Sequence, residues 1–203
     1  MSSTRPKRTG RRPGSTDTRE LIAVAARTLF AELGYERTSF RRIASTAGVD
    51  PALVVHFYGS KEDLFRRVMA TPPTIADALE RLGDGPRETV GRRLAELLVG
   101  GLENPSTRPI VVGRIRCAST HPEAAALVRE TVTRDLRRLA STLTDDEPDR
   151  RAVLVGATFV GMAIARYVVL VEPLASMSSS DVIETIAPTF QHYLVEPLTT
   201  AAG

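Results

Sequence analysis

Cysteine is almost absent from this 203-residue chain, which contains Cys117 alone. A single thiol cannot form an intrachain disulfide, so nothing in the sequence requires an oxidising compartment. The sequence is therefore typical of a protein of the reduced cytoplasm.

The familiar catalytic and metal-binding motifs are also missing. The sequence has no Gly-x-Ser-x-Gly elbow, no Walker-type phosphate loop and no cluster of cysteine and histidine at metal-ligand spacing. None of His56, His121 and His192 follows a glutamate by three residues, as a di-iron site in a helical bundle would require. We therefore predict no enzyme activity, no cofactor and no metal site.

Long hydrophobic runs are lacking as well. Arg27 and Glu32 interrupt the first apolar stretch, which argues against a signal peptide. Residues 152–174 approach the length of a membrane span, but Arg166 within them would cost roughly 2.5–3.5 kcal/mol near a bilayer centre. We interpret this segment as a buried helix and expect no membrane partner.

Positive charge is concentrated in the amino-terminal third. Residues 1–70 contain 13 Lys and Arg against 7 Asp and Glu, whereas residues 71–203 contain 14 against 17. A basic region of this kind suits a polyanion such as double-stranded DNA.

Residues 1–14 are rich in Arg, Gly, Pro and Ser and have almost nothing apolar. We expect a flexible basic arm, because such a segment cannot offset its ordering entropy by burial. Arg11 and Arg12 could enter a narrow minor groove, or the arm could remain a solvated tail that only adds nonspecific phosphate attraction. The sequence leaves these two alternatives open.

Apolar residues at helical spacing predict a helix over residues 16–33, which Gly34 ends. Two short helices follow at 39–47 and 51–57, with Thr38 as a cap for the first, and a fourth covers 60–71 before two prolines. Two short helices joined by a three-residue turn form a helix-turn-helix, so residues 15–71 are predicted to be a DNA-binding domain.

The remainder, residues 72–203, is predicted to be a second helical domain. No segment shows the two-residue alternation that a sheet would need, so the expected fold class is all-α. Helices are expected at 73–82, 86–102, 107–118, 122–143, 148–171 and 181–194.

The residues around the helix-turn-helix resemble the tetracycline-repressor (TetR) family over about residues 16–65. The resemblance is carried by Gly34-Tyr35, Thr38-Ser39, Ile43-Ala44, Ala47-Gly48-Val49, His56-Phe57-Tyr58 and Ser60-Lys61. It implies a bacterial transcriptional regulator, most often a repressor, whose carboxy-terminal helices form an effector pocket and a homodimer. A homodimer would read an inverted repeat in DNA.

By position, the resemblance also implies individual DNA contacts. Thr38 and Lys61 would hold phosphates, and Arg41 and Arg42 would add phosphate contacts. The sequence departs from the commonest family pattern at Val55, where a tyrosine is frequent, and at Phe57, where a histidine is frequent. The DNA-facing side of the second helix would consist of Pro51, Ala52, Val55 and His56.

The last helix carries an apolar stripe that the outermost helix of one small domain hardly needs. We therefore assign the stripe to a homodimer interface, together with a glycine of the preceding helix. The predicted interface residues are Gly156, Ile183, Ile186, Phe190 and Leu194.

Arg166 is a charge within an apolar helix, close to Phe159 and Met162. It could form an internal salt bridge, or it could contact a small-molecule effector that is otherwise largely apolar. Arg114 is undecided in the same way. A third reading keeps the DNA-binding regulator but gives it no effector, so that the carboxy-terminal domain only dimerises or docks a protein partner.

Overall fold

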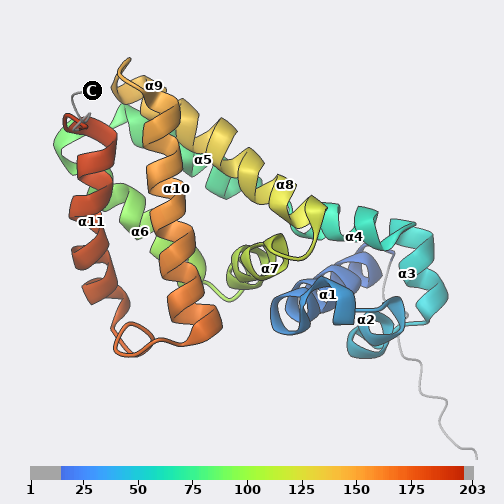
Figure 1. Cartoon of the computed structure of the whole chain (residues 1–203). Helices are drawn as coiled ribbons and strands as arrows, with labels where there is room; N and C mark the ends of the chain where they lie inside the picture. The colour runs from blue at the N-terminus through green and yellow to red at the C-terminus, as the bar shows by residue number, and fades with distance from the viewer. Residues whose placement is uncertain (1–14, 199–203) are drawn as a thin grey trace, which may run out of the picture.

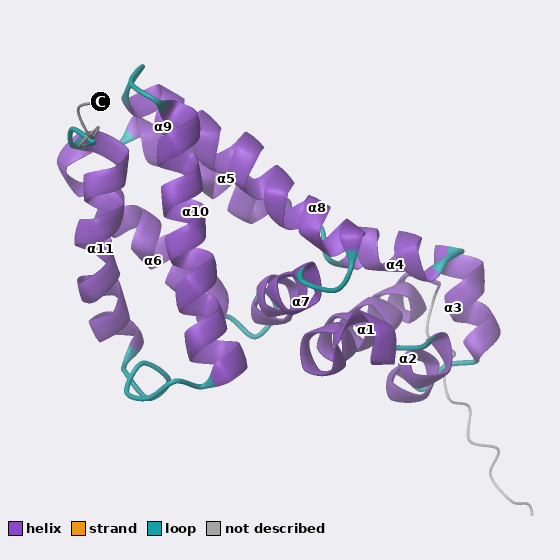
Figure 2. Cartoon of the chain, in the orientation of Figure 1, coloured by secondary structure: helices purple, strands orange, loops and turns teal. Residues whose placement is uncertain are grey.

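The structure, a computed structural model, describes residues 15–198. Helices fill this part of the chain and no strand forms within it (Figure 2), which confirms the predicted all-α class. The α-helices are α1 (Ser15–Arg37), α2 (Phe40–Ala47), α3 (Pro51–Tyr58), α4 (Lys61–Val68), α5 (Pro73–Arg81), α6 (Val90–Glu103), α7 (Arg108–Ala118), α8 (Pro122–Glu130), α9 (Arg137–Leu143), α10 (Pro148–Ile164) and α11 (Ser179–Val195). Short 3-10 turns, η1 (Leu82–Asp84) and η2 (Arg87–Thr89), precede α6, and π-helical turns, η3 (Thr131–Leu136) and η4 (Ala165–Val169), follow α8 and α10.

The helices form two groups along the molecule (Figure 1). Helices α1–α4 lie at one end, α5, α6 and α9–α11 make up the other, and α8 extends from the end of α4 toward the second group. Helix α7 lies between them and packs on α1. The two groups are therefore joined by direct helix packing as well as by the chain at Pro72.

An aromatic cluster forms the centre of the amino-terminal group. The Phe30 and Phe65 rings meet edge to face with centroids 4.9 Å apart, and Tyr35 stacks on Phe30. Such pairs add to the stabilisation that burial of the rings already provides. Gly34 interrupts α1 with φ 78°, so the predicted stop is present as a break, although helical structure continues to Arg37.

Helices α6 and α11 pack closely because α6 carries a glycine at their crossing. A methyl group added at Gly91 would lie 2.4 Å from the backbone nitrogen of Gln191, and the Gly91 N–H donates to Gln191 Oε1 at 2.8 Å. The apolar side of α11 is thereby buried inside its own subunit, with Phe190 fully buried.

This packing corrects the predicted dimer interface. Ile186, Phe190 and Leu194 belong to the core that α6 and α11 share, and Ile183 is partly buried against the same core. Gly156 is buried too, because it faces the Val132 side chain of η3. Ile186, Phe190, Leu194 and Gly156 therefore have no free surface for a second subunit in this conformation, whereas Ile183, which is only partly buried, remains a predicted interface residue.

Helix α10 is less buried than the sequence predicts. The segment Pro148–Val169 is long and apolar enough to span a membrane by length and composition alone. Arg151 and Arg166 at its two ends are nevertheless buried and hydrogen-bonded within the chain. One side of the helix remains open, since Val153 and Ile164 are exposed.

Candidate nucleic-acid interface and internal cavity

The turn between α2 and α3 has the geometry of a helix-turn-helix. Gly48 adopts a left-handed conformation, with φ 67° and ψ 33°, which ends α2. Asp50 then caps α3 by accepting a hydrogen bond from the Ala52 N–H at 2.8 Å, and Pro51 occupies the first helical position. Local sequence thus determines where the second helix starts.

Helix α3 is fixed from behind by the rest of the domain. Val54 is fully buried, and the Tyr58 hydroxyl donates to the Arg19 carbonyl of α1 at 3.0 Å. Arg67 of α4 donates to the Phe57 carbonyl at 3.3 Å near the carboxyl end of the helix. These contacts hold the outer face of α3 in one orientation.

That outer face contains the residues predicted to face DNA. Pro51, Ala52, Val55 and His56 are all exposed, with Val55 at 52%. Leu53 is exposed as well, at 36%. Apart from the His56 imidazole, the face is apolar, so it offers contacts suited to thymine methyl groups.

Helix α2 precedes α3 in the sequence, and its amino-terminal end is basic. Arg41 and Arg42 are exposed, and no carboxylate of residues 15–198 forms an ion pair with either. The cap is Ser39, which accepts a hydrogen bond from the Arg42 N–H at 3.4 Å. Ser39 therefore replaces Thr38 as the capping residue.

Two predicted phosphate contacts are turned inward. Thr38 is buried and its hydroxyl donates to the Gly34 carbonyl at 2.8 Å. The Lys61 ammonium lies 4.1 Å from the centre of the Tyr35 ring, and partial burial lowers the pKa of Lys61. Thr38 is thus withdrawn from solvent and Lys61 is partly so, while Arg11 and Arg12 lie outside the described residues.

A partly open cavity of about 80 Å³ lies between α5, α6, α7, α8, η3 and α10. Arg114 and Phe159 line it, but Met162 and Arg166 do not. Gly156, predicted for the dimer interface, is also in its wall. Most of the lining is apolar: Ile75, Leu79, Leu97, Leu98, Ile110, Val111, Ile115, Val128, Val132, Leu136 and Val160.

Arg114 is the charged residue of this cavity wall. It is 8% exposed and donates from Nη1 to the hydroxyls of Thr71, at 2.9 Å, and Thr131, at 3.4 Å. Burial lowers the pKa of Arg114 to about 10, since desolvation disfavours its charged form. Sequence reasoning missed both threonines, because they lie 43 and 17 residues away along the chain.

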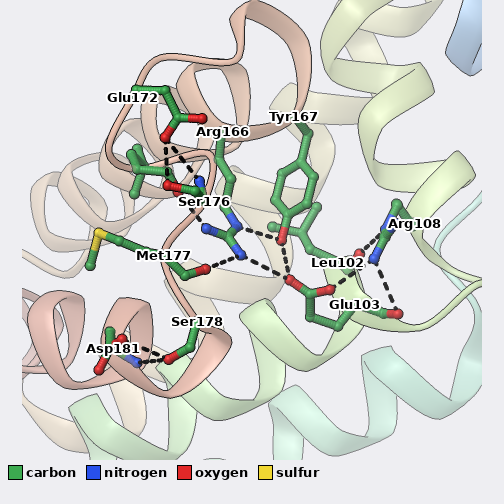
Figure 3. A network of polar contacts seen from close by, with 11 residues as sticks. Leu102, Glu103, Arg108, Arg166, Tyr167, Glu172, Ser176, Met177, Ser178 and Asp181 are labelled. Atoms are coloured by element: carbon green, nitrogen blue, oxygen red, sulfur yellow. Dashed lines mark hydrogen bonds and ion pairs between the residues drawn. The ribbon is translucent and has the colours of Figure 1, made fainter.

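Arg166 has an internal role instead (Figure 3). Its Nη2 donates to the Met177 carbonyl at 2.8 Å and lies 3.5 Å from Glu103 Oε1, and its Nη1 donates to the Leu174 carbonyl. The hydroxyl of Tyr167 donates to the same carboxylate at 2.6 Å, which lowers the pKa of Glu103. Of the two alternatives for Arg166, the structure contains the salt bridge.

The helix that carries Arg114 also touches the DNA-binding helices. A methyl group added at Gly113 would lie 2.8 Å from Met69 Cε and 3.4 Å from the Ala31 nitrogen. Farther along, Arg66 of α4 forms an ion pair with Glu123 of α8 at 3.1 Å. Helix α7 is therefore in direct contact with α1 and with the residue that follows α4, so a shift of α7 would displace both.

Comparison with known proteins identifies both parts of the chain. Residues 22–68 match the family described as bacterial regulatory proteins of the tetR family, and residues 88–194 match the tetracyclin repressor-like C-terminal domain. A TetR-family regulator of Streptomyces coelicolor shares 36% identity and superposes with a TM-score of 0.63, over 91% of this chain and 98% of that one.

Two further relatives are more distant. The transcriptional repressor AcnR of Corynebacterium glutamicum is 32% identical over 90 residues, which are 44% of this chain and 43% of the repressor, so less than half of that relative is matched. NalD of Pseudomonas aeruginosa, the secondary repressor of a multidrug efflux pump, shares the fold at 21% identity, with a TM-score of 0.61 over 91% of this chain and all of that one (100%). The chain therefore belongs to the TetR family of bacterial DNA-binding regulators.

Proposed function

We propose that the protein is a cytoplasmic, homodimeric repressor that binds an inverted repeat through α3 and releases it when a small molecule occupies the cavity. The observation that carries the proposal is the exposed outer face of α3, held from behind by Val54 and Tyr58. A rigid helix with a free face at this position is what insertion into a major groove requires.

The proposed DNA contacts divide into two kinds. Pro51, Ala52, Val55 and His56 would meet base edges, with the apolar members against thymine methyl groups. Arg41 and Arg42, together with Arg11 and Arg12 of the arm, would neutralise phosphates. Thr38 and Lys61 are omitted, because one hydroxyl is already bonded and one ammonium lies on Tyr35.

The open side of α10 is the proposed subunit interface. Val153, Ala157, Gly161 and Ile164 are exposed and recur at intervals of three or four residues, so they share one face of the helix. The small residues in its middle would let a second helix approach closely. Two copies paired through this face would present two α3 helices to one inverted repeat.

The cavity is the proposed effector site. Its volume of about 80 Å³ is smaller than the roughly 150 Å³ known to accommodate benzene in an engineered protein cavity, so a larger effector must displace the walls. Since α7 forms one wall and touches Met69 through Gly113, displacement would shift the DNA-binding helices. Effector and operator would then weaken each other's binding by the same factor.

The first test is selection of binding sites from random DNA duplexes with the full chain. We expect an enriched inverted repeat that Val55→Glu no longer binds, because the carboxylate would face bases and phosphates. Val24→Glu is the matched control, since Val24 on α1 has the same 52% exposure as Val55. Binding without sequence preference, or equal loss in both variants, would contradict a specific contact by α3.

The same selection addresses the arm. A chain that lacks residues 1–14 should bind more weakly and with a shallower dependence of affinity on salt, because fewer phosphates are neutralised. Loss of a preference for the base pairs that flank the repeat would assign Arg11 and Arg12 to the minor groove. An unchanged flanking preference would leave the arm with phosphate attraction alone.

A further inference from the structure

We propose that the effector is an amphipathic carboxylate, whose charged group pairs with Arg114 and whose apolar body fills the rest of the cavity. The inference rests on the proposed effector role of the cavity and specifies its ligand chemistry. It is carried by a buried guanidinium that lines the cavity and has no carboxylate partner among residues 15–198.

Three arginines are buried in the described part of the chain, and they differ in their partners. Arg151 pairs with Asp146 at 2.7 Å and Arg166 with Glu103 at 3.5 Å. Arg114, in contrast, forms no ion pair within residues 15–198: its hydrogen bonds go to the neutral hydroxyls of Thr71 and Thr131, and the carboxylates of Asp135 and Glu130 act on it only from beyond ion-pair distance. Burial of a charge costs free energy unless a partner compensates it, and Arg114 is the one of the three that lacks a directly bonded anion.

The geometry of Arg114 leaves room for such an anion. Its hydrogen bonds within residues 15–198 both leave Nη1, whereas a guanidinium carries five N–H donors. Nε and Nη2 are thus left for an acceptor that fits the planar donor fork, and a carboxylate accepts two parallel hydrogen bonds of this kind.

The remaining lining defines the rest of the ligand. The wall beyond Arg114 consists mostly of aliphatic side chains and Phe159, and the hydroxyls of its threonines, Thr71, Thr107 and Thr131, are already hydrogen-bonded within the chain. A ligand with polar groups along its length would leave them without partners there. One anionic end and a flexible apolar body match the lining, and a flexible body also suits walls that must move apart.

The pairing would also affect the junction between the two helix groups. Thr71 lies three residues after the end of α4 and accepts a hydrogen bond from Arg114 Nη1, the same nitrogen that bonds Thr131. A carboxylate that draws the guanidinium toward itself would weaken the Arg114–Thr71 hydrogen bond. The bound ligand would thus weaken the hydrogen bond that links α7 to the segment after α4.

The test compares ligands that differ only in their head group. Hexanoate, octanoate and decanoate are titrated into the purified full chain by calorimetry, alongside hexanol, octanol and decanol. We expect each carboxylate to bind at least about tenfold more tightly than the alcohol of the same length, as befits a charge-assisted pair (about 1.4 kcal/mol).

Variants on α7 assign the preference to one residue. Arg114→Met should remove the difference between carboxylate and alcohol while retaining binding of the alcohols, because the apolar volume is kept. Arg116→Met should preserve the preference, since Arg116 lies on the same helix but outside the cavity wall. Circular dichroism of both variants verifies that they fold.

Three results would overturn the inference: equal affinities for the two series in the unaltered chain, no binding of any carboxylate, or a preference that survives in Arg114→Met. The first two results are measured on the unaltered chain, so the inference remains testable even if Arg114→Met does not fold. Operator binding by the ligand-free chain is measured from the same preparation. Specific operator binding without carboxylate recognition would overturn only the ligand class, whereas loss of operator binding would overturn the proposed function.

Discussion

The guanidinium of Arg114 and the hydroxyl of Thr71 are joined by a hydrogen bond of 2.9 Å between the cavity wall and the end of the DNA-binding helices. Arg114 lies on α7, and Thr71 follows α4 just before Pro72 and Pro73. The two prolines restrict the backbone directly after Thr71, so the hydrogen bond joins the cavity wall to a segment with little conformational freedom.

The unpaired charge of Arg114 leads to a prediction about stability. Arg114→Met should raise the free energy of unfolding of the ligand-free protein by about 1 kcal/mol, because a buried charge without a directly bonded counter-ion is replaced by an apolar side chain of similar length. The measurement is urea unfolding followed by circular dichroism. A variant less stable than the original chain would mean that the two threonine hydrogen bonds outweigh the desolvation of the charge.

Arg151 is the matched control for this substitution. It is buried as well, but it pairs with Asp146 and donates to the carbonyls of Tyr193 and Glu196 at 2.8 and 2.9 Å. Arg151→Met should therefore destabilise the protein by about 2–4 kcal/mol, since it leaves carbonyl groups near the end of α11 without donors. Opposite changes in the free energy of unfolding for Arg114→Met and Arg151→Met would distinguish a buried arginine without an ion pair from one that holds the structure together.

The network around Glu103 predicts a dependence of stability on pH. The hydrogen bond from Tyr167 holds the pKa of Glu103 below its ordinary value, so the folded state favours the ionised carboxylate. Its contribution is present above the unfolded pKa, near about 4.3, and is lost as the pH falls through the lower folded pKa.

Glu103→Gln tests this contribution, since the amide keeps an acceptor but loses the charge. We expect the variant to be about 1 kcal/mol less stable at pH 7, and the difference should shrink as the pH falls below about 4. Urea unfolding at several pH values measures both quantities. A difference that is independent of pH would show that the charge of Glu103 contributes nothing.

Much of the helical architecture could be predicted from the sequence because the signals are local. Pro51, Pro122 and Pro148 each occupy the first position of a helix, and Gly48 supplies the left-handed residue that ends α2. The exposed face of α3 was predictable for the same reason, since a short helix has one buried side. The correction of the α2 cap from Thr38 to its neighbour is a shift of one residue.

The covered faces of the other helices could not be predicted, because they depend on contacts between distant residues. The α11 stripe is covered by α6, which approaches only because position 91 is a glycine some 100 residues away from its contact Gln191. Arg166 and Glu103 are separated by 63 residues, so spacing along one helix could not reveal the pair. Periodicity identifies an apolar side but not the element that covers it.

The proposed interface on the open face of α10 leads to a prediction about the oligomeric state. Ala157→Glu should convert the proposed dimer to a monomer, because it would place a charge in the middle of the proposed apolar contact between two copies of α10. Sedimentation equilibrium measures the effect, and Ser141→Glu, an exposed position on α9, is the control. A dimer that survives Ala157→Glu would place the interface elsewhere on the molecule.

Two glycines of α6 provide the sharpest test of the packing that buries the α11 stripe. Gly91→Ala should destabilise the protein by about 1–3 kcal/mol, since the added methyl would lie 2.4 Å from the Gln191 nitrogen and 2.6 Å from the Ala187 carbonyl oxygen, both backbone atoms. Gly100→Ala, in the same helix, has nothing within 4 Å of the added methyl and should stabilise by about 0.5–1 kcal/mol through helix propensity. The midpoint temperature of thermal unfolding should therefore fall for Gly91→Ala and rise for Gly100→Ala. If Gly91→Ala were as benign as Gly100→Ala, the close approach of α6 and α11 would be absent in solution, and Ile186, Phe190 and Leu194 would again be available to a second subunit.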